Sequence, residues 1–282
     1  MEKTNIRRLV GVMMPFVIMV ILQRLLLVLS GMSGLPDVIG STLAFLAASA
    51  AGIFFFRMSC GAEALRPGTQ TQPEPDGESG GKENPVVPFP AKDTLFGRMM
   101  YALAGAGVLT VTMYAVTAAV GSEPVSAFAP DTLAAEFVSL ILIHPFLEEY
   151  IFRWLYYREL RPMQPIFAGL TQAVMFAIVH GSVGGMIYAL FAGIVLVLIT
   201  ELSGSLSAAV IAHILMNLRS FVYLTWLTED VFADAERIRM LLDTGVVSVG
   251  FAAMLCLLVR RGLREARAGA GETEDGGEND DD

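Results

Sequence analysis

Long apolar runs alternate with short polar segments along this chain, and the runs have the length that crosses a bilayer. A membrane-spanning helix needs about 20 mainly apolar residues. Runs of this kind predict about eight spans, at residues 9–29, 38–56, 96–120, 132–157, 165–180, 183–200, 205–226 and 241–259. Because lipid offers no hydrogen bonds to exposed backbone, we expect an all-α polytopic membrane protein.

Polar segments divide the predicted spans into a two-helix N-terminal part and a six-helix core. Residues 1–57 hold the first two spans, and residues 58–95 are rich in Pro, Gly and charge, which is typical of a flexible linker. Residues 96–260 hold the remaining six spans. The last part, residues 261–282, ends in the acidic run GETEDGGENDDD, and we expect a disordered cytoplasmic tail there.

The composition agrees with a membrane location and excludes several kinds of partner. Hydrophobic residues make up 54% of the chain and charged residues only 17%, well below the share of charge in soluble domains. The formal net charge of -9 arises largely from the acidic tail, and no basic stripe with aromatic residues indicates nucleic-acid binding. Cys60 and Cys256 are too few and too far apart for a disulfide framework or a thiolate metal site. We therefore expect membrane lipid, and no nucleic acid, as a partner.

Lys and Arg near the ends of the spans predict the orientation of the chain. Basic residues precede the first span, flank the linker and follow the fourth and the last spans, which places them on one side for an even number of spans. Cytoplasmic loops carry the excess of Lys and Arg in membrane proteins. We expect both termini to be cytoplasmic and the protein to be a multi-pass protein of the cell (cytoplasmic) membrane.

The fourth span contains a histidine, two adjacent glutamates and an arginine. A charged side chain at bilayer depth costs about 3 kcal/mol, so such residues usually face a protein interior and mark function. Glu149 and Arg153 are four residues apart with the acid first, which favours an ion pair on one helix face. Glu148 lies about 100° around the helix from Glu149, so we expect it to be the chemically available carboxylate. His144 could share the face of Glu148, and we assign it no role beyond a supporting hydrogen bond.

Two later spans carry the other histidines, each with a neighbour on the same helix face. Phe176 and His180 are four residues apart, and so are His213 and Asn217. In lipid, these polar faces should turn inward and toward one another. A single intramembrane His or Asn often only bonds two helices together, but a Glu, two His and an Asn form an acid–base set.

The three polar faces carry the motifs of a known family. They are E-E-x-x-x-R (Glu148, Glu149, Arg153), F-x-x-x-H (Phe176, His180) and H-x-x-x-N (His213, Asn217). In order and spacing they resemble the CAAX-processing and bacteriocin-processing (CPBP) intramembrane endopeptidases, which include the type II CAAX prenyl endopeptidase. The resemblance implies an eight-helix hydrolase whose catalytic residues line a water-accessible cavity in the bilayer. It also implies a membrane-associated or lipidated peptide as substrate.

The resemblance further implies a role for each motif residue. Glu148 would be the catalytic glutamate, and His180 would assist it in activating water. His213 and Asn217 would hold the substrate carbonyl and stabilise the oxyanion. The residues with supporting roles would be Glu149, Arg153 and Phe176.

Other mechanisms and other functions remain open at this point. We prefer a glutamate-activated water without a cofactor, and the alternative is a metalloprotease that uses a divalent metal such as zinc. Glu148, His180 and His213 offer one carboxylate and two imidazoles, the ligand set of some zinc sites, although no H-E-x-x-H motif is present. Polar residues at mid-membrane also fit an ion- or proton-coupled transporter, which the absence of an obvious internal repeat disfavours, or a non-catalytic membrane scaffold.

Overall fold

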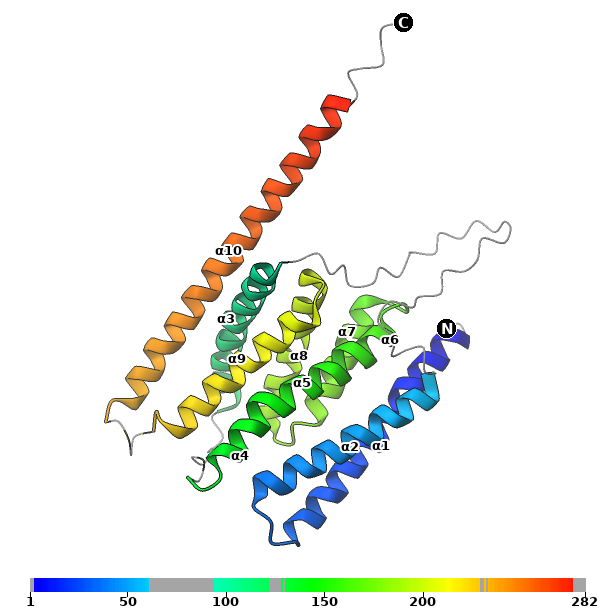
Figure 1. Ribbon diagram of the computed structural model, residues 1–282, viewed down its shortest axis with the longest axis vertical. Helices are drawn as coiled ribbons and strands as arrows, with labels where there is room; N and C mark the ends of the chain where they lie inside the picture. The colour runs from blue at the N-terminus through cyan, green and yellow to red at the C-terminus, as the bar shows by residue number, and fades with distance from the viewer. Residues whose placement is uncertain are drawn as a thin grey trace, which may run out of the picture.

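The structure is a computed structural model that describes residues 3–60, 94–121, 128, 130–228, 231 and 233–275. Within this part of the chain every regular element is a helix, which confirms the predicted all-α fold (Figure 1). Most of the predicted linker, residues 61–93, and the end of the predicted tail, residues 276–282, lie outside the described residues.

The helices follow the predicted spans closely. In chain order they are α1 (Lys3–Gly31), α2 (Asp37–Cys60), α3 (Leu95–Val120), α4 (Leu133–Phe137), η2 (Val138–Ile143), α5 (His144–Glu148), η3 (Glu149–Tyr157), α6 (Arg158–Leu160), α7 (Pro165–Ile178), α8 (Val183–Ser203), α9 (Leu206–Thr225) and α10 (Ala235–Asp275). The elements from α4 to α6 follow one another without a break and form a single rod. Helix α10 continues through residues 261–275, which the sequence assigned to the tail, because Ala, Arg and Glu in that segment are good helix formers.

Six of the described helices are long and apolar enough to cross a bilayer: α1, α2, α3, α8, α9 and α10. Helix α7 is apolar but shorter. The rod from α4 to α6 occupies the fourth predicted span, although it is not among the six. Its middle carries Glu148, Glu149 and Arg153, which lower its hydropathy.

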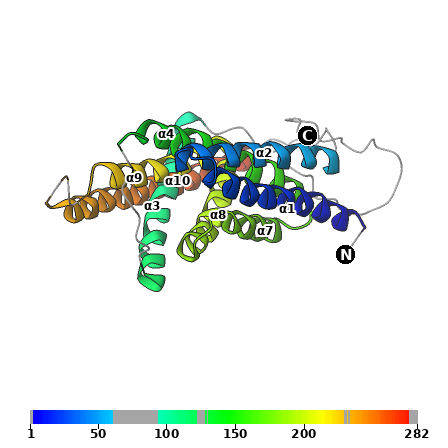
Figure 2. The same cartoon turned by 90° about the horizontal axis from the view of Figure 1, so that it is seen from below.

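The hairpin of α1 and α2 lies along one edge of the bundle, and α10 lies along the opposite edge beside α3 (Figure 1). Helices α3, α8 and α9 contact one another in the middle, and α7 lies against both α8 and η3. Seen from below, α4 and α8 lie on opposite sides of the bundle (Figure 2). The hairpin contacts the rod through Phe16, whose ring meets Phe152 and Tyr156 edge to face.

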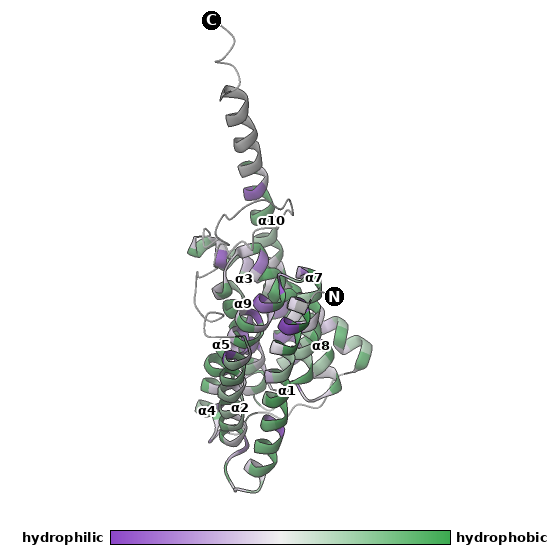
Figure 3. Ribbon diagram, turned by 90° about the vertical axis from the view of Figure 1, so that its right-hand side faces the viewer, coloured by the Kyte–Doolittle hydropathy of each residue, from purple (hydrophilic) through white to green (hydrophobic). Residues whose placement is uncertain are grey.

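Apolar side chains cover the outside of the helices, as expected for a surface that faces lipid. Apolar positions extend along the length of the helices (Figure 3), and exposed examples on α10 are Leu255, Leu258 and Val259. Charged side chains inside the bundle are buried instead, and Glu149 and Arg153 are both 0% exposed. A buried charge needs a partner, so these residues indicate where the interior is specialised.

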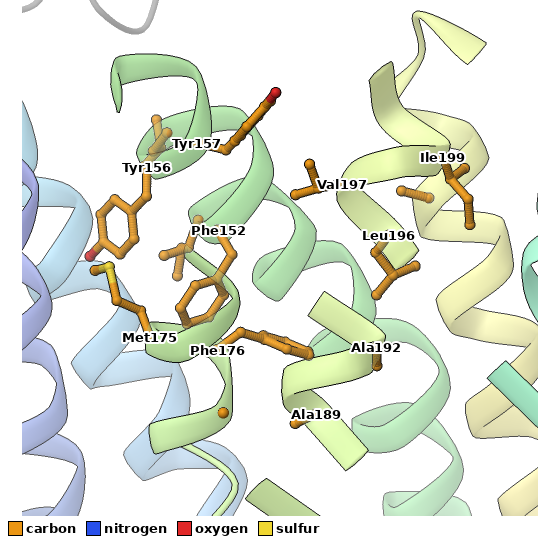
Figure 4. Close-up of a cluster of buried hydrophobic side chains, with 14 of the residues drawn as sticks. Phe152, Tyr156, Tyr157, Met175, Phe176, Ala189, Ala192, Leu196, Val197 and Ile199 are labelled. Carbon is orange, nitrogen blue, oxygen red and sulfur yellow. The ribbon is translucent and has the colours of Figure 1, made fainter. Parts of the chain in front are cut away.

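An aromatic layer connects the rod to α7 and α8. Phe152 of η3 and Phe176 of α7 meet edge to face, with ring centroids 5.2 Å apart. Both rings point into the space between the helices (Figure 4). Helices α7 and α8 approach closely there, since a Cβ on Gly193 would lie 2.9 Å from the Cα of Ala173. This packing fixes Phe176 and, with it, the end of α7 that precedes His180.

Candidate active site

Pro145 reshapes the rod that carries the two glutamates. The N–H of His144 donates to the carbonyl of Ser139, five residues back, as in a π-helix. In a helix the carbonyl of Leu140 would accept from the N–H of residue 144 or 145. The N–H of His144 is used by Ser139, and Pro145 has no N–H, so this carbonyl has no backbone donor from either residue. Asn217 of α9 takes this place, and its Nδ2 donates to Leu140 O at 2.8 Å. The irregular rod therefore fixes one predicted site residue through a backbone contact.

Glu149, Arg153 and His213 form a buried ionic cluster. A terminal nitrogen of Arg153 lies 3.0 Å from Glu149 Oε1, the ion pair that the four-residue spacing predicted. His213 Nδ1 lies 2.9 Å from the same oxygen. Since an ionised carboxylate only accepts hydrogen bonds, Nδ1 carries a proton and donates it. Arg153 also lies over the ring of Phe176, 4.3 Å from its centroid, which gives this buried cation a second favourable contact.

The two carboxylate oxygens of Glu148 have different neighbours. Oε1 lies 2.9 Å from His144 Nδ1, and Oε2 lies 3.7 Å from His213 Nε2. As the sequence predicted, the ion pair of Arg153 is with Glu149 and not with Glu148. Glu148 is nevertheless not free of partners, because His144 occupies one oxygen. Its second oxygen, Oε2, remains the one that can bind and deprotonate a water molecule.

His180 lies in the turn between α7 and α8 rather than inside a helix. Its Nδ1 lies 2.7 Å from the carbonyl of Phe176, which can only accept, so Nδ1 again carries the proton. The next residue, Gly181, has a φ of 78°, a conformation that favours glycine and lets the chain reverse into α8. The side chain is therefore held at one nitrogen, while Nε2 stays available to water or substrate.

A cavity of about 290 Å³ connects these side chains. Its lining residues with polar groups come from separate parts of the chain, and they are Gln23, His144, Glu148, His180, Tyr188, His213 and Asn217. The cavity has room for several water molecules, each of which occupies about 30 Å³ in the liquid. Its position inside the bundle, beside a buried carboxylate, makes it a place where water can meet a substrate away from bulk solvent.

The four residues predicted as catalytic all line this cavity, and they are Glu148, His180, His213 and Asn217. Of the residues predicted to support them, Phe176 also lines the cavity. Glu149 and Arg153 lie behind His213 and are fully buried. The structure thus brings together residues that are up to 69 positions apart in the sequence, from Glu148 to Asn217.

Among the lining residues that sequence reasoning did not find are Gln23 of α1 and Phe45 of α2. Both belong to the N-terminal hairpin, which the sequence motifs do not reach. Phe45 looks like any other aromatic residue in an apolar span, so nothing in its local pattern points to the cavity. Gln23 is polar in an apolar run and was the available signal, because such residues usually face a protein interior.

The side chains around the cavity include potential metal ligands, among them the carboxylate of Glu148 and the imidazoles of His180 and His213. Within the described residues, no group of three or more His, Cys, Asp or Glu side chains is placed so that it could hold one metal ion. The Nδ1 atoms of His180 and His213 have protein partners, whereas Glu148 Oε2 and both Nε2 atoms have no hydrogen-bond partner among the described residues. The described residues therefore contain no preformed metal centre.

These features define a class: an all-α polytopic membrane protein with an acid–base set around a cavity inside its helices. Residues 130–219 match the family model described as type II CAAX prenyl endopeptidase Rce1-like. The matched segment contains all three motifs, and it confirms the predicted family. Over this segment the chain is similar to the CPBP intramembrane proteases. Searches of curated proteins and of solved structures find no significant match.

Proposed function

We propose that this protein is an intramembrane endopeptidase that hydrolyses a peptide bond of a membrane-associated or lipidated peptide, with Glu148 as the base. The observation that carries the proposal is the meeting of Glu148, His180, His213 and Asn217 around one cavity. These residues come from the rod, the α7–α8 turn and α9. A carboxylate, two imidazoles and an amide provide a base, proton carriers and donors for a developing negative charge.

The first step is attack of water on the substrate carbonyl. Glu148 Oε2 takes a proton from the water while the water oxygen bonds to the carbonyl carbon. His180 offers Nε2 to the same water, because its Nδ1 is held by Phe176 O at 2.7 Å. A positioned general base contributes about 10²- to 10⁴-fold to a rate, so Glu148 should be the most sensitive single position.

The negative charge that forms on the carbonyl oxygen needs donors. His213 lies between two carboxylates, with Nδ1 2.9 Å from Glu149 and Nε2 3.7 Å from Glu148. Its Nε2 faces the cavity side of the imidazole and, when it carries a proton, can donate to the oxyanion. Asn217 uses one N–H for Leu140 and keeps a second for the same task. Loss of one such donor typically raises the barrier by about 3 kcal/mol.

The last step is release of the amine. Glu148 returns the proton that it took from water to the nitrogen of the scissile bond, and the C–N bond breaks. The products are a new carboxylic acid and a new amine, which exchange a proton to give a carboxylate and an ammonium group, and Glu148 is again ionised. One carboxylate therefore serves first as base and then as acid, which is why Oε2 must face both water and the leaving nitrogen.

The location of the cavity and the family match support a substrate that approaches from the membrane. The apolar outer surface of the helices leaves the cavity inside a lipid-facing bundle. The matched family is described by a prenyl endopeptidase activity. A peptide with a farnesylated cysteine three residues from its C-terminus is therefore the first probe.

The proposal is tested with purified protein in lipid nanodiscs and this farnesylated peptide. We expect the wild-type protein to release the C-terminal tripeptide and Glu148→Ala to abolish the release, as read by mass spectrometry. Glu136→Ala is the matched control, because Glu136 lies in the same rod in α4 and does not line the cavity. Cleavage by purified Glu148→Ala at the wild-type rate would overturn the assignment.

A second experiment separates the glutamate mechanism from the metal alternative. We expect exhaustive chelation followed by dialysis to leave the rate unchanged. A loss of activity that zinc restores would instead support a metalloprotease. The same samples can be analysed for bound metal by mass spectrometry, so the outcome does not depend on activity alone.

A further inference from the structure

The N-terminal hairpin reaches the candidate site through a stacked pair of rings. Phe45 of α2 and His144 of α5 have ring centroids 4.2 Å apart and planes inclined by only 9°. Phe45 is 4% exposed, so its ring is held by the surrounding helices. On the other side of the stack, His144 Nδ1 lies 2.9 Å from Glu148 Oε1. A side chain of α2 thus touches the residue that touches the catalytic carboxylate.

A second contact fixes α2 against the same part of the rod. Thr42, which precedes Phe45 by almost one helical turn, shares a hydrogen bond with Ser139, with 2.7 Å between the two hydroxyl oxygens. The carbonyl of Ser139 accepts the N–H of His144. Helix α2 therefore contacts both ends of the irregular turn that places His144. Two contacts of this kind restrict rotation of α2 relative to the rod.

The imidazole determines which oxygen of Glu148 is available. A glutamate side chain has three rotatable bonds, and in a cavity with room for water it can adopt several orientations. A hydrogen bond from His144 Nδ1 holds Oε1, so Oε2 is directed at His213 and the cavity. Charge-assisted bonds of this type are among the stronger ones in proteins. The stack with Phe45 in turn holds the imidazole in the orientation that makes this bond.

We propose that His144 and Phe45 are positioning residues for Glu148, so that the N-terminal hairpin completes the active site of the protease core. The expected change in kcat rests on the proposed function, whereas the contacts of His144 with Phe45 and Glu148 do not. The hairpin lies outside the segment that matches the family model, which begins at residue 130. The residues that orient Glu148 therefore include one, Phe45, that lies outside the matched segment.

The hydrogen bond is tested with an isosteric pair of variants. The Nδ2 of an asparagine occupies the place of His Nδ1, so His144→Asn keeps a donor to Glu148, whereas His144→Leu has nearly the same shape and no donor. We expect His144→Leu to lower kcat by about 10- to 100-fold with little change in KM, as for loss of a hydrogen bond to a charged group. His144→Asn should recover most of this loss. Equal losses in both variants, or a kcat of His144→Leu within twofold of wild type, would overturn the proposal.

The stack is tested with the same substitution at two places on α2. Phe45→Leu removes the ring that faces His144, and we expect kcat to fall by about 2- to 10-fold, as for loss of an aromatic pair. Phe54→Leu is the control, since Phe54 is 58% exposed on the outer side of the same helix. Thermal unfolding is measured for both, so that a general loss of folded protein is separated from a change in kcat. Equal kcat values for the two variants would contradict the role of Phe45.

A readout without catalysis separates this inference from the proposed function. The chain has three histidines, so ¹⁵N spectra of histidine-labelled protein contain three imidazoles, and His144→Asn identifies its own signals. We expect the Nδ1 signal of His144 to shift in Glu148→Gln and in Phe45→Leu, and to stay unchanged in Phe54→Leu. Shifts of this pattern in a protein that cleaves no peptide would contradict the proposed function alone. Cleavage with an unshifted His144 signal would contradict the positioning role alone.

Discussion

Two ionic clusters with buried charges include residues of α9, and they are built in opposite ways. The cluster at the cavity contains Glu148, Glu149, Arg153 and His213, and the second cluster contains Tyr114, Arg219, Tyr223 and Asp243. Both hold charge among apolar helices, where a charge without a partner is costly. They differ in how completely their polar atoms are paired.

The second cluster is fully bonded around one carboxylate. Asp243 of α10 accepts two hydrogen bonds at each oxygen, all at 2.6 Å: Arg219 Nε and Tyr223 OH on Oδ1, and Tyr114 OH and a terminal nitrogen of Arg219 on Oδ2. Its members come from α3, α9 and α10. Every oxygen position is occupied by protein, so this cluster can hold α10 against the core and has no place for a substrate.

The cavity cluster leaves polar atoms unpaired. Glu149 Oε2 and all three guanidinium nitrogens of Arg153 have no hydrogen-bond partner among the described residues, although one terminal nitrogen forms the ion pair with Glu149 at 3.0 Å. Glu148 Oε2 has only a 3.7 Å neighbour. Incomplete pairing lowers stability, and the proposed function supplies a reason for it at Glu148, where Oε2 has to bind water. The comparison suggests a general distinction: in a structural intramembrane cluster every polar atom has a hydrogen-bond partner, whereas in a reactive cluster some polar atoms do not.

Glu148→Gln should give the largest effect of the substitutions that test this comparison. The amide cannot act as a base, so we expect kcat to fall by about 10²- to 10⁴-fold. The shape is kept and one of two adjacent negative charges is removed, so the midpoint of thermal unfolding should stay the same or rise. A fall in this midpoint that matches the loss of activity would show that the cavity cluster is structural after all.

Asp243→Ala should act mainly on stability. It leaves Arg219 buried beside two tyrosines without its carboxylate, and breaking a buried pair in this way costs about 3–5 kcal/mol. We expect a lower midpoint of thermal unfolding, with kcat of the folded fraction within about twofold of wild type. The double variant Arg219→Met/Asp243→Leu should regain most of the stability, because it removes both charges together. A large loss of kcat in the folded fraction would contradict the division of roles.

Asn217→Leu should affect both properties, since Asn217 lies between the two clusters on α9. Leucine has nearly the same shape, but it leaves the carbonyl of Leu140 without a donor, at a cost of about 1–3 kcal/mol in unfolding free energy. It also removes one donor to the oxyanion, so kcat should fall by about 10²-fold. Asn217→Gln is the control, because it keeps the amide group but places it one methylene further from the backbone. Unchanged kcat in Asn217→Leu would leave Asn217 with a structural role only.

Glu201→Gln should give the smallest effect. Glu201 and Arg161 form a two-bond ion pair at 2.8 and 3.0 Å, but both side chains are about one quarter exposed. Pairs of this kind contribute about 0–1 kcal/mol, and they weaken in salt. We expect a change below about 1 kcal/mol in unfolding free energy and no change in kcat. A destabilisation as large as that of Asp243→Ala would show that partial exposure does not limit the contribution of an ion pair to stability.

The sequence predicted the helices and the cavity residues well for two physical reasons. Apolar runs of membrane length leave few alternatives to a helix, and four-residue spacing places Glu149 with Arg153 whatever the tertiary structure. The contact of Asn217 with Leu140 could not be predicted in the same way, because it depends on the backbone irregularity at Pro145. The approach of Phe45 to His144 depends on the packing of α2, which local spacing does not specify. Buried Asp243 and Arg219 were visible as charges in apolar runs, but their pairing joins two helices.

The charged middle of the rod has a consequence for how the chain enters the membrane. Each charged residue at the centre of an isolated segment adds about 2.5–3.5 kcal/mol to the free energy of insertion, and the rod carries Glu148, Glu149 and Arg153 close together. Each of the six long apolar helices has an 18-residue stretch with at most two charged residues. The rod should therefore partition poorly by itself and should depend during biogenesis on the helices that pack against it, such as α7 and α9. The residues that make hydrolysis inside a bilayer feasible thus make their own helix reliant on cooperative membrane insertion.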